Sequence, residues 1–195
     1  MGGADRGAAM AASIARAARS MRMSEADIRG LSRAHALAME RRVATLDDDH
    51  HPLFLHPGRS VLILIRDVGC ADLRMLAAAS LVESEDAEFR TAAAAIRASL
   101  GDEVAELVGS VPLARTESLA EALVTAPDPV RLVALAERLD HLRHAHLRDA
   151  GREWRALAHA EAEAVYLPVA MRTHPRLSDR YQHWCQAFAR RLERD

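Results

Sequence analysis

The sequence has two cysteines, few aromatic residues, no lysine and no long apolar run. Because Cys70 and Cys185 lie far apart without a paired spacing, they favour neither a zinc knuckle nor a disulfide scaffold. No stretch approaches the roughly 18 apolar residues of a membrane-spanning helix, and the first residues lack the apolar core of a secretory signal. We therefore expect a soluble cytoplasmic protein with no membrane partner.

The charge balance and the shortage of aromatic residues argue against a nucleic-acid partner. A formal net charge of −2 gives no basic field of the kind that drives nucleic-acid binding. Aromatic side chains are too few for a base-stacking platform. The sequence also lacks a Gly-x-Ser-x-Gly motif, a phosphate-binding glycine loop and a dinucleotide fingerprint. The absence of lysine reflects a GC-rich genome and indicates no function.

Helical signals dominate what is present. Apolar residues recur at helical spacing, strand alternation is absent, and the length suits one domain. We predict a single all-α helical bundle over residues 24–195, preceded by a flexible N-terminal tail at 1–23. Ser24 and Asp27 resemble a capping box at the first helix. The predicted helices are 25–43, 57–68, 71–83, 87–100, 102–110, 116–125, 129–148, 152–172 and 176–193.

Residues 77–86 read Ala-Ala-Ala-Ser-Leu-Val-Glu-Ser-Glu-Asp. They resemble a segment of HD-domain phosphohydrolases in which apolar residues precede His-Asp, two variable residues and Glu-Asp. Other segments resemble the same family in the same chain order, in particular the hydrolase domain of the bifunctional alarmone synthetase/hydrolases. These are Leu55-His56-Pro57, residues 96–105, residues 136–143 and residues 166–172. The resemblance spans roughly residues 30–190 and implies an HD-domain-like bundle.

The resemblance also implies where a metal would bind and why it is lost. In this family a divalent metal is held by the histidine of the His-Pro segment, the His-Asp dyad and a later aspartate. These positions fall here on His56, on Leu81 with Val82, and on Glu137. Since two apolar side chains cannot coordinate an ion, we expect no metal and no cofactor.

A loop rich in carboxylates and imidazoles could rebuild the lost site. Residues 47–51 read Asp-Asp-Asp-His-His, just before His56. Mn²⁺ or Zn²⁺ accepts such mixed ligands, so His56 and Glu137 could act with His50, His51 or Asp49. The alternative is a solvated loop whose aspartates favour turns.

Glu85 and Asp86 also allow two interpretations. The resemblance implies that they act on the attacking water, and with His56 they are the candidate catalytic residues. Without a metal, such carboxylates could still do acid/base work on an uncharged or cationic substrate. Alternatively, they cap a helix that begins near Ala87.

The helix at 129–148 has one leucine-rich stripe and a neighbouring polar arc that includes Glu137, Asp140 and His141. The leucines predict core contacts. The resemblance places Glu137 and His141 toward a central cleft, where a small molecule or nucleotide would bind. The candidate ligand-binding residues are Arg59, Glu137, Asp140, His141 and Arg143.

The function that follows is that of a degenerate HD-domain protein without the standard metal centre. It would bind a nucleotide, a small metabolite or a partner protein in a regulatory role, with a homodimer as a further form. The first alternative is an active phosphohydrolase with a relocated metal. The second is a metal-free enzyme of changed chemistry that uses the same cleft.

Overall fold

The computed structural model describes residues 3–46, 48–115, 118–147 and 151–194. All regular secondary structure in these ranges is helical, so the chain is all-α as predicted. The first half comprises α1 (Gly3–Ser20), α2 (Glu25–Thr45), α3 (His56–Ile63), a π-helix (Leu64–Val68), α4 (Leu73–Leu81), α5 (Ala93–Leu100) and α6 (Asp102–Ser110). The second half comprises α7 (Leu119–Thr125), α8 (Asp128–His144), α9 (Arg152–Glu161), a π-helix (Ala162–Tyr166), α10 (Leu167–Thr173) and α11 (Pro175–Leu192).

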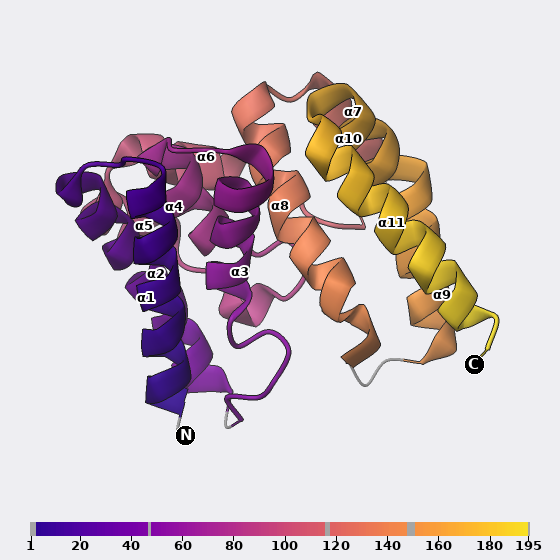
Figure 1. The fold of residues 1–195 in the computed structure, drawn as a ribbon, viewed down its shortest axis with the longest axis horizontal. Coiled ribbons are helices and arrows are strands. Elements are labelled where there is room, and N and C mark those ends of the chain that lie inside the picture. The colour runs from indigo at the N-terminus through magenta and orange to yellow at the C-terminus, as the bar shows by residue number, and fades with distance from the viewer. Residues whose placement is uncertain (1–2, 47, 116–117, 148–150, 195) are drawn as a thin grey trace.

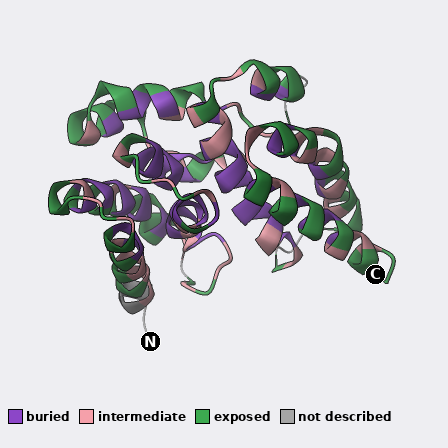
Figure 2. Ribbon diagram, turned by 45° about the horizontal axis from the view of Figure 1, so that its top comes forward, coloured by how far each residue is buried: buried purple, intermediate pink, exposed green. Residues whose placement is uncertain are grey.

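Helix α8 lies in the middle of the molecule (Figure 1). It packs against α3 and α4 on the side of the N-terminal helices and against α10 and α11 on the other side. Nearly all of its central residues are buried, including charged ones (Figure 2). Side chains from α3, α4 and α8 are thereby brought together in the interior. No helix in the described ranges is long and apolar enough to cross a membrane.

The N-terminal segment is not the flexible tail that the sequence predicted. Residues 3–20 form α1, which packs against α2 and α3. Ile14, Ala17 and Ala18 are buried in the main hydrophobic cluster. Small alanines allow this close packing, and burial of the apolar face stabilises a helix that composition alone did not reveal.

Several helix ends follow their local sequence signals. The Ser24 hydroxyl oxygen accepts a hydrogen bond from the Asp27 backbone N–H, which confirms the predicted cap of α2. Pro57 and Pro129 lie in the first turns of α3 and α8, as predicted. Before Pro168 the helix widens into the π-helix at Ala162–Tyr166, because proline cannot donate the usual backbone hydrogen bond.

The prediction of one helix over residues 87–100 was wrong. A short 3₁₀ turn at Ala87–Phe89 is followed by extended Arg90 and then by α5. Phe89 is buried, and the Arg42 guanidinium lies 5.2 Å from its ring centroid. This tertiary contact holds the segment out of a continuous helix. The predicted helix ends at 116 and 148 lie outside the described residues.

Candidate functional site

His56 begins α3 and is completely buried. Its Nδ1 lies 2.8 Å from the Asp140 Oδ2 of α8. The same carboxylate accepts hydrogen bonds from Arg59 Nε, one turn along α3. Because an ionised carboxylate only accepts hydrogen bonds, Nδ1 carries the proton and the His56 Nε2 lone pair faces the other way.

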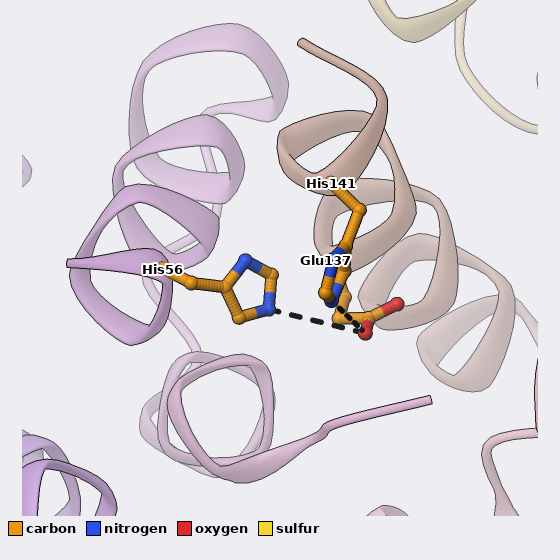
Figure 3. Close-up of side chains that lie close together, drawn as sticks. All are labelled: His56, Glu137 and His141. Atoms are coloured by element: carbon orange, nitrogen blue, oxygen red, sulfur yellow. Dashed lines mark ion pairs between the residues drawn. The ribbon is translucent and has the colours of Figure 1, made fainter. Parts of the chain in front are cut away.

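Glu137 and His141 of α8 lie opposite that free nitrogen (Figure 3). The Oε1 atom of Glu137 is 3.9 Å from His56 Nε2 and 3.2 Å from His141 Nε2. The two imidazole rings lie close, with centroids 4.2 Å apart. His56 and Glu137 are thus within the reach of one bridging water, as the resemblance implied.

The segment after α4 supplies two further residues, and they are not the pair that the sequence indicated. Leu81 ends α4 and, like Val82, is buried in the hydrophobic clusters. Ser84 donates hydrogen bonds to Glu137 from both its backbone N–H and its hydroxyl, at 2.9–3.0 Å. Glu83 places Oε1 3.0 Å from His141 Nε2. The two positions to which the resemblance assigned the dyad, Leu81 and Val82, are therefore in the hydrophobic clusters, and Glu83 and Ser84 contact the α8 side chains instead.

Arginines neutralise the carboxylates of this cluster. Arg42 of α2 donates to Glu83 Oε2 at 2.9 Å and is itself 2% exposed. Arg138 of α8 contacts Glu85 Oε1, which Arg115 also contacts at 2.7 Å. Each buried acid therefore has a cationic partner, as buried charges require.

Burial and neighbouring charges oppose each other in setting the protonation states. Burial alone would lower the pKa of His141, but the carboxylates of Glu83 and Glu137 outweigh it and raise this pKa to about 10. Burial lowers the pKa of His56, and the charge of His141 adds to this effect, despite the opposing Asp140 carboxylate. Burial would raise the pKa of Asp140, but His56 and Arg59 hold it well below its usual range. The cluster therefore contains an imidazolium at position 141 and a neutral imidazole at position 56.

Three imidazole nitrogens in the cluster have no well-aligned hydrogen bond: His56 Nε2 and both nitrogens of His141. His141 Nε2 does lie close to two carboxylates, so these are charge contacts with poor hydrogen-bond alignment. The ligand atoms of His56, Glu137 and His141 lie within 4.8 Å of one another and could hold a metal ion. A second such group comprises Glu83, Asp86 and His141.

The histidine- and aspartate-rich loop does not join the cluster. In the described residues, neither group that could hold a metal includes Asp49, His50 or His51. Asp48 Oδ1 accepts a hydrogen bond from the His50 backbone N–H, and His51 Nδ1 accepts one from the Leu53 N–H. These side chains stabilise the turns of the loop. The structure therefore does not bring the loop residues together with His56 and Glu137 as metal ligands.

Glu85 and Asp86 have different surroundings. Burial would raise the pKa of Glu85, but Arg138, His141 and Arg115 lower it to about 2. Asp86 precedes the 3₁₀ turn at Ala87–Phe89, and its side chain makes no capping hydrogen bond there. The capping alternative therefore holds only for the position of Asp86, at the N-cap of a 3₁₀ turn and without a side-chain hydrogen bond to it.

The remaining candidates, Arg59, Asp140 and Arg143, border a cavity of about 430 Å³ beside the cluster. Asp140 belongs to both, because its buried carboxylate binds His56 on one side and Arg59 on the other. The structure thus separates the predicted cleft into a closed cluster and an adjoining cavity.

Sequence reasoning missed Arg42, Glu83, Ser84 and Arg138. Glu83 and Ser84 stand in the same acidic run as Glu85 and Asp86, but the resemblance assigned them to the two variable positions of the motif. Arg42 lies in a Glu-Arg-Arg run typical of a solvated helix face, and no sequence signal distinguishes it.

No family model matches this sequence, and no curated protein matches it.

Proposed function

We propose that this chain is a non-hydrolytic, HD-domain-like protein that acts by binding a nucleotide, small metabolite or partner in a regulatory role. The observation that carries the proposal is the internal neutralisation of the buried cluster. Four carboxylates, Glu83, Glu85, Glu137 and Asp140, face the cations Arg42, Arg59, Arg138 and protonated His141, and Arg115 adds a fifth positive charge at Glu85. A divalent ion would add positive charge to a group whose carboxylates already have cationic partners.

Burial of the cluster supports the same proposal. His56, Glu137 and Asp140 are at most 1% exposed, and His141 is 3% exposed. A catalytic metal needs a coordination position that is open to water and substrate. The cavities that border the cluster are lined by Glu83 with Ser84, by Glu85 or by Asp140, and none of these three is lined by His56, Glu137 or His141. The cluster therefore acts as a charged core that positions α3, α4 and α8.

The observed geometry suggests a different assignment of the His-Asp dyad positions in the resemblance to HD-domain hydrolases. If the dyad positions fall on Glu83 and Ser84, the His-Asp pair has become Glu-Ser. Ser84 then binds Glu137 directly through hydrogen bonds, where the family would place a shared metal. On this proposal, protein hydrogen bonds have replaced the ion.

The test is the metal content of the protein purified with Mn²⁺ and Zn²⁺ available, together with an assay on guanosine tetraphosphate. We expect bound metal far below one equivalent and turnover no faster than the background reaction. One equivalent of metal that is lost in His56→Ala, but kept in the loop variant His51→Ala, would overturn the proposal.

A second candidate is a relocated metal centre on His56, Glu137 and His141. It is favoured by the unpartnered His56 Nε2, because metal-binding histidines usually donate their other N–H to a carboxylate, as His56 does to Asp140. Once His141 has released its proton, two imidazoles and a carboxylate suit Zn²⁺ or Mn²⁺, and such an ion would supply Lewis acidity for hydrolysis. Cobalt titration followed by visible absorption separates the candidates, since tetrahedral binding gives intense bands that His56→Ala abolishes.

A further inference from the structure

The cavity beside the buried cluster is lined mostly by residues that do not belong to the cluster. It lies between α3 with its π-helical extension, α8 and α11, the elements seen around the centre of Figure 1. Its volume of about 430 Å³ falls in the range of small-molecule sites. Its lining residues are Arg59, Leu62, Ile63, Arg66, Asp67, Asp140, Arg143, His144 and Arg180.

Two of its arginines contact a single carboxylate, and a third has no anionic partner in the described part of the chain. Arg180 donates to Asp67 Oδ1 from Nε at 3.1 Å and from its terminal nitrogen at 2.9 Å. Arg143 lies 3.7 Å from the other oxygen of Asp67. Arg66, one residue earlier in the chain, has no hydrogen bond or ion pair with any described residue and is exposed. These three guanidinium groups therefore carry a surplus of two positive charges.

The other side of the cavity does not remove this surplus. Arg59 is held by Asp140 and by the Pro52 carbonyl oxygen. The Asp140 carboxylate is also bound to His56, so it is already shared between two donors inside the protein. With four arginines and two carboxylates, the cavity attracts anions.

We infer that this cavity binds a small organic anion carrying two or more negative charges, of the phosphate-ester or diphosphate class. Guanidinium groups match phosphate oxygens with paired hydrogen bonds, and Arg66, Arg143 and Arg180 line the cavity from three different helices. Leu62 and Ile63 form an apolar wall for the organic part of the ligand. The inference rests on the proposed binding function and names the ligand class.

Calorimetric titration of the full chain in a chelating buffer tests it, with inorganic diphosphate and a nucleoside diphosphate as the probes. Both carry the required charge, and only the nucleoside diphosphate can contact the apolar wall. We expect saturable binding of both probes, which weakens with added salt, and tighter binding of the nucleoside diphosphate. Equal affinity would assign the site to the diphosphate group alone and retain the anionic class.

Charge-reversal variants locate the binding. Arg66→Glu and Arg180→Glu should each weaken binding by about tenfold or more, because each removes a phosphate contact and adds repulsion. Arg172→Glu is the matched control, since Arg172 is an exposed arginine on α10 outside the cavity lining and the net charge changes equally. Equal losses in all three variants, or no saturable binding of either probe below about 1 mM, would overturn the inference.

The same titration separates this inference from the proposed function. If the nucleoside diphosphate is hydrolysed after the chelator is removed and Mn²⁺ is added, the non-hydrolytic proposal is refuted, while Arg66-dependent binding would still support the anion site. Absence of binding in a protein that is also metal-free and inactive would remove the anion site alone.

Discussion

His56 Nδ1 lies 2.8 Å from Asp140 Oδ2, across 84 positions of sequence and between two helices that pack side by side. The contact fixes the ring orientation and tautomer of His56, and it ties α3 to α8. Arg59 binds the same carboxylate at 2.8 Å. Asp140 is therefore the residue through which the buried cluster and the arginine-lined cavity meet.

Substitution of this carboxylate should be costly. Asp140→Asn leaves His56 and Arg59 without their anionic partner in a buried setting, so we expect a loss of about 3–5 kcal/mol in unfolding free energy. Urea denaturation followed by circular dichroism measures it. The exposed pair of Arg97 and Asp102 provides the control, where Asp102→Asn should cost less than about 1 kcal/mol. Similar losses in both variants would contradict the role given to Asp140.

The buried pair of Arg42 and Glu83 should show strong coupling. Arg42→Met leaves Glu83 with His141 as its cationic partner, Glu83→Met leaves Arg42 without its carboxylate, and the double variant removes both charges. We expect each single change to cost about 3–5 kcal/mol and the double change to cost clearly less than the sum. A double-mutant cycle in urea measures the coupling. The exposed pair of Arg19 and Glu25 should give near-additive effects, and additivity at Arg42 and Glu83 would refute the buried ion pair.

The register of the site can be tested by writing a metal-binding dyad into the chain. Glu83→His with Ser84→Asp should raise Zn²⁺ affinity by at least about tenfold, because both side chains face Glu137 and His141. Leu81→His with Val82→Asp should destabilise the fold without creating a site, since these residues lie in the hydrophobic clusters. Calorimetry with Zn²⁺, with circular dichroism as the check on folding, distinguishes the two double variants. Metal binding by the second variant alone would restore the original register.

His35 should make stability depend on pH. Burial, with the nearby charge of Arg42, lowers the pKa of His35 from 6.5 to about 4. Between these values the unfolded chain binds a proton that the folded chain does not, so stability falls as pH drops from about 6.5 toward 4. Above pH 6.5 His35 has no such effect. At pH 5 the loss relative to pH 7 should be about 2 kcal/mol.

Urea denaturation at several pH values measures this slope. His35→Leu should remove this part of the slope, whereas His183→Leu, at an exposed position, should leave it unchanged. An unaltered slope in His35→Leu would show that His35 takes up its proton equally in both states.

The sequence by itself determined the fold class and most helix positions, because apolar spacing, proline and capping residues act over a few neighbouring residues. Ser24 caps α2 and Pro129 opens α8 for local reasons that are readable from the chain. The resemblance also predicted one site that contains His56 and Glu137, and the structure places His56 Nε2 3.9 Å from Glu137 Oε1. Local patterns and chain order carried that information without any knowledge of the packing.

Only the tertiary structure decided which side chains complete the site. Where α4 ends, the direction of each following side chain depends on how the backbone leaves the helix, so Glu83 and Ser84 face α8 while Leu81 and Val82 face the core. Arg42 pairs with Glu83, which is 41 residues away in the sequence, and the charged helix face around Arg42 does not predict this pairing. The docking of α1 depends on an apolar surface that exists only after α2 and α3 have packed. Neighbouring residues in the sequence do not predict such long-range packing and charge pairing. The interacting groups are far apart in the chain, and only the folded structure brings them into contact.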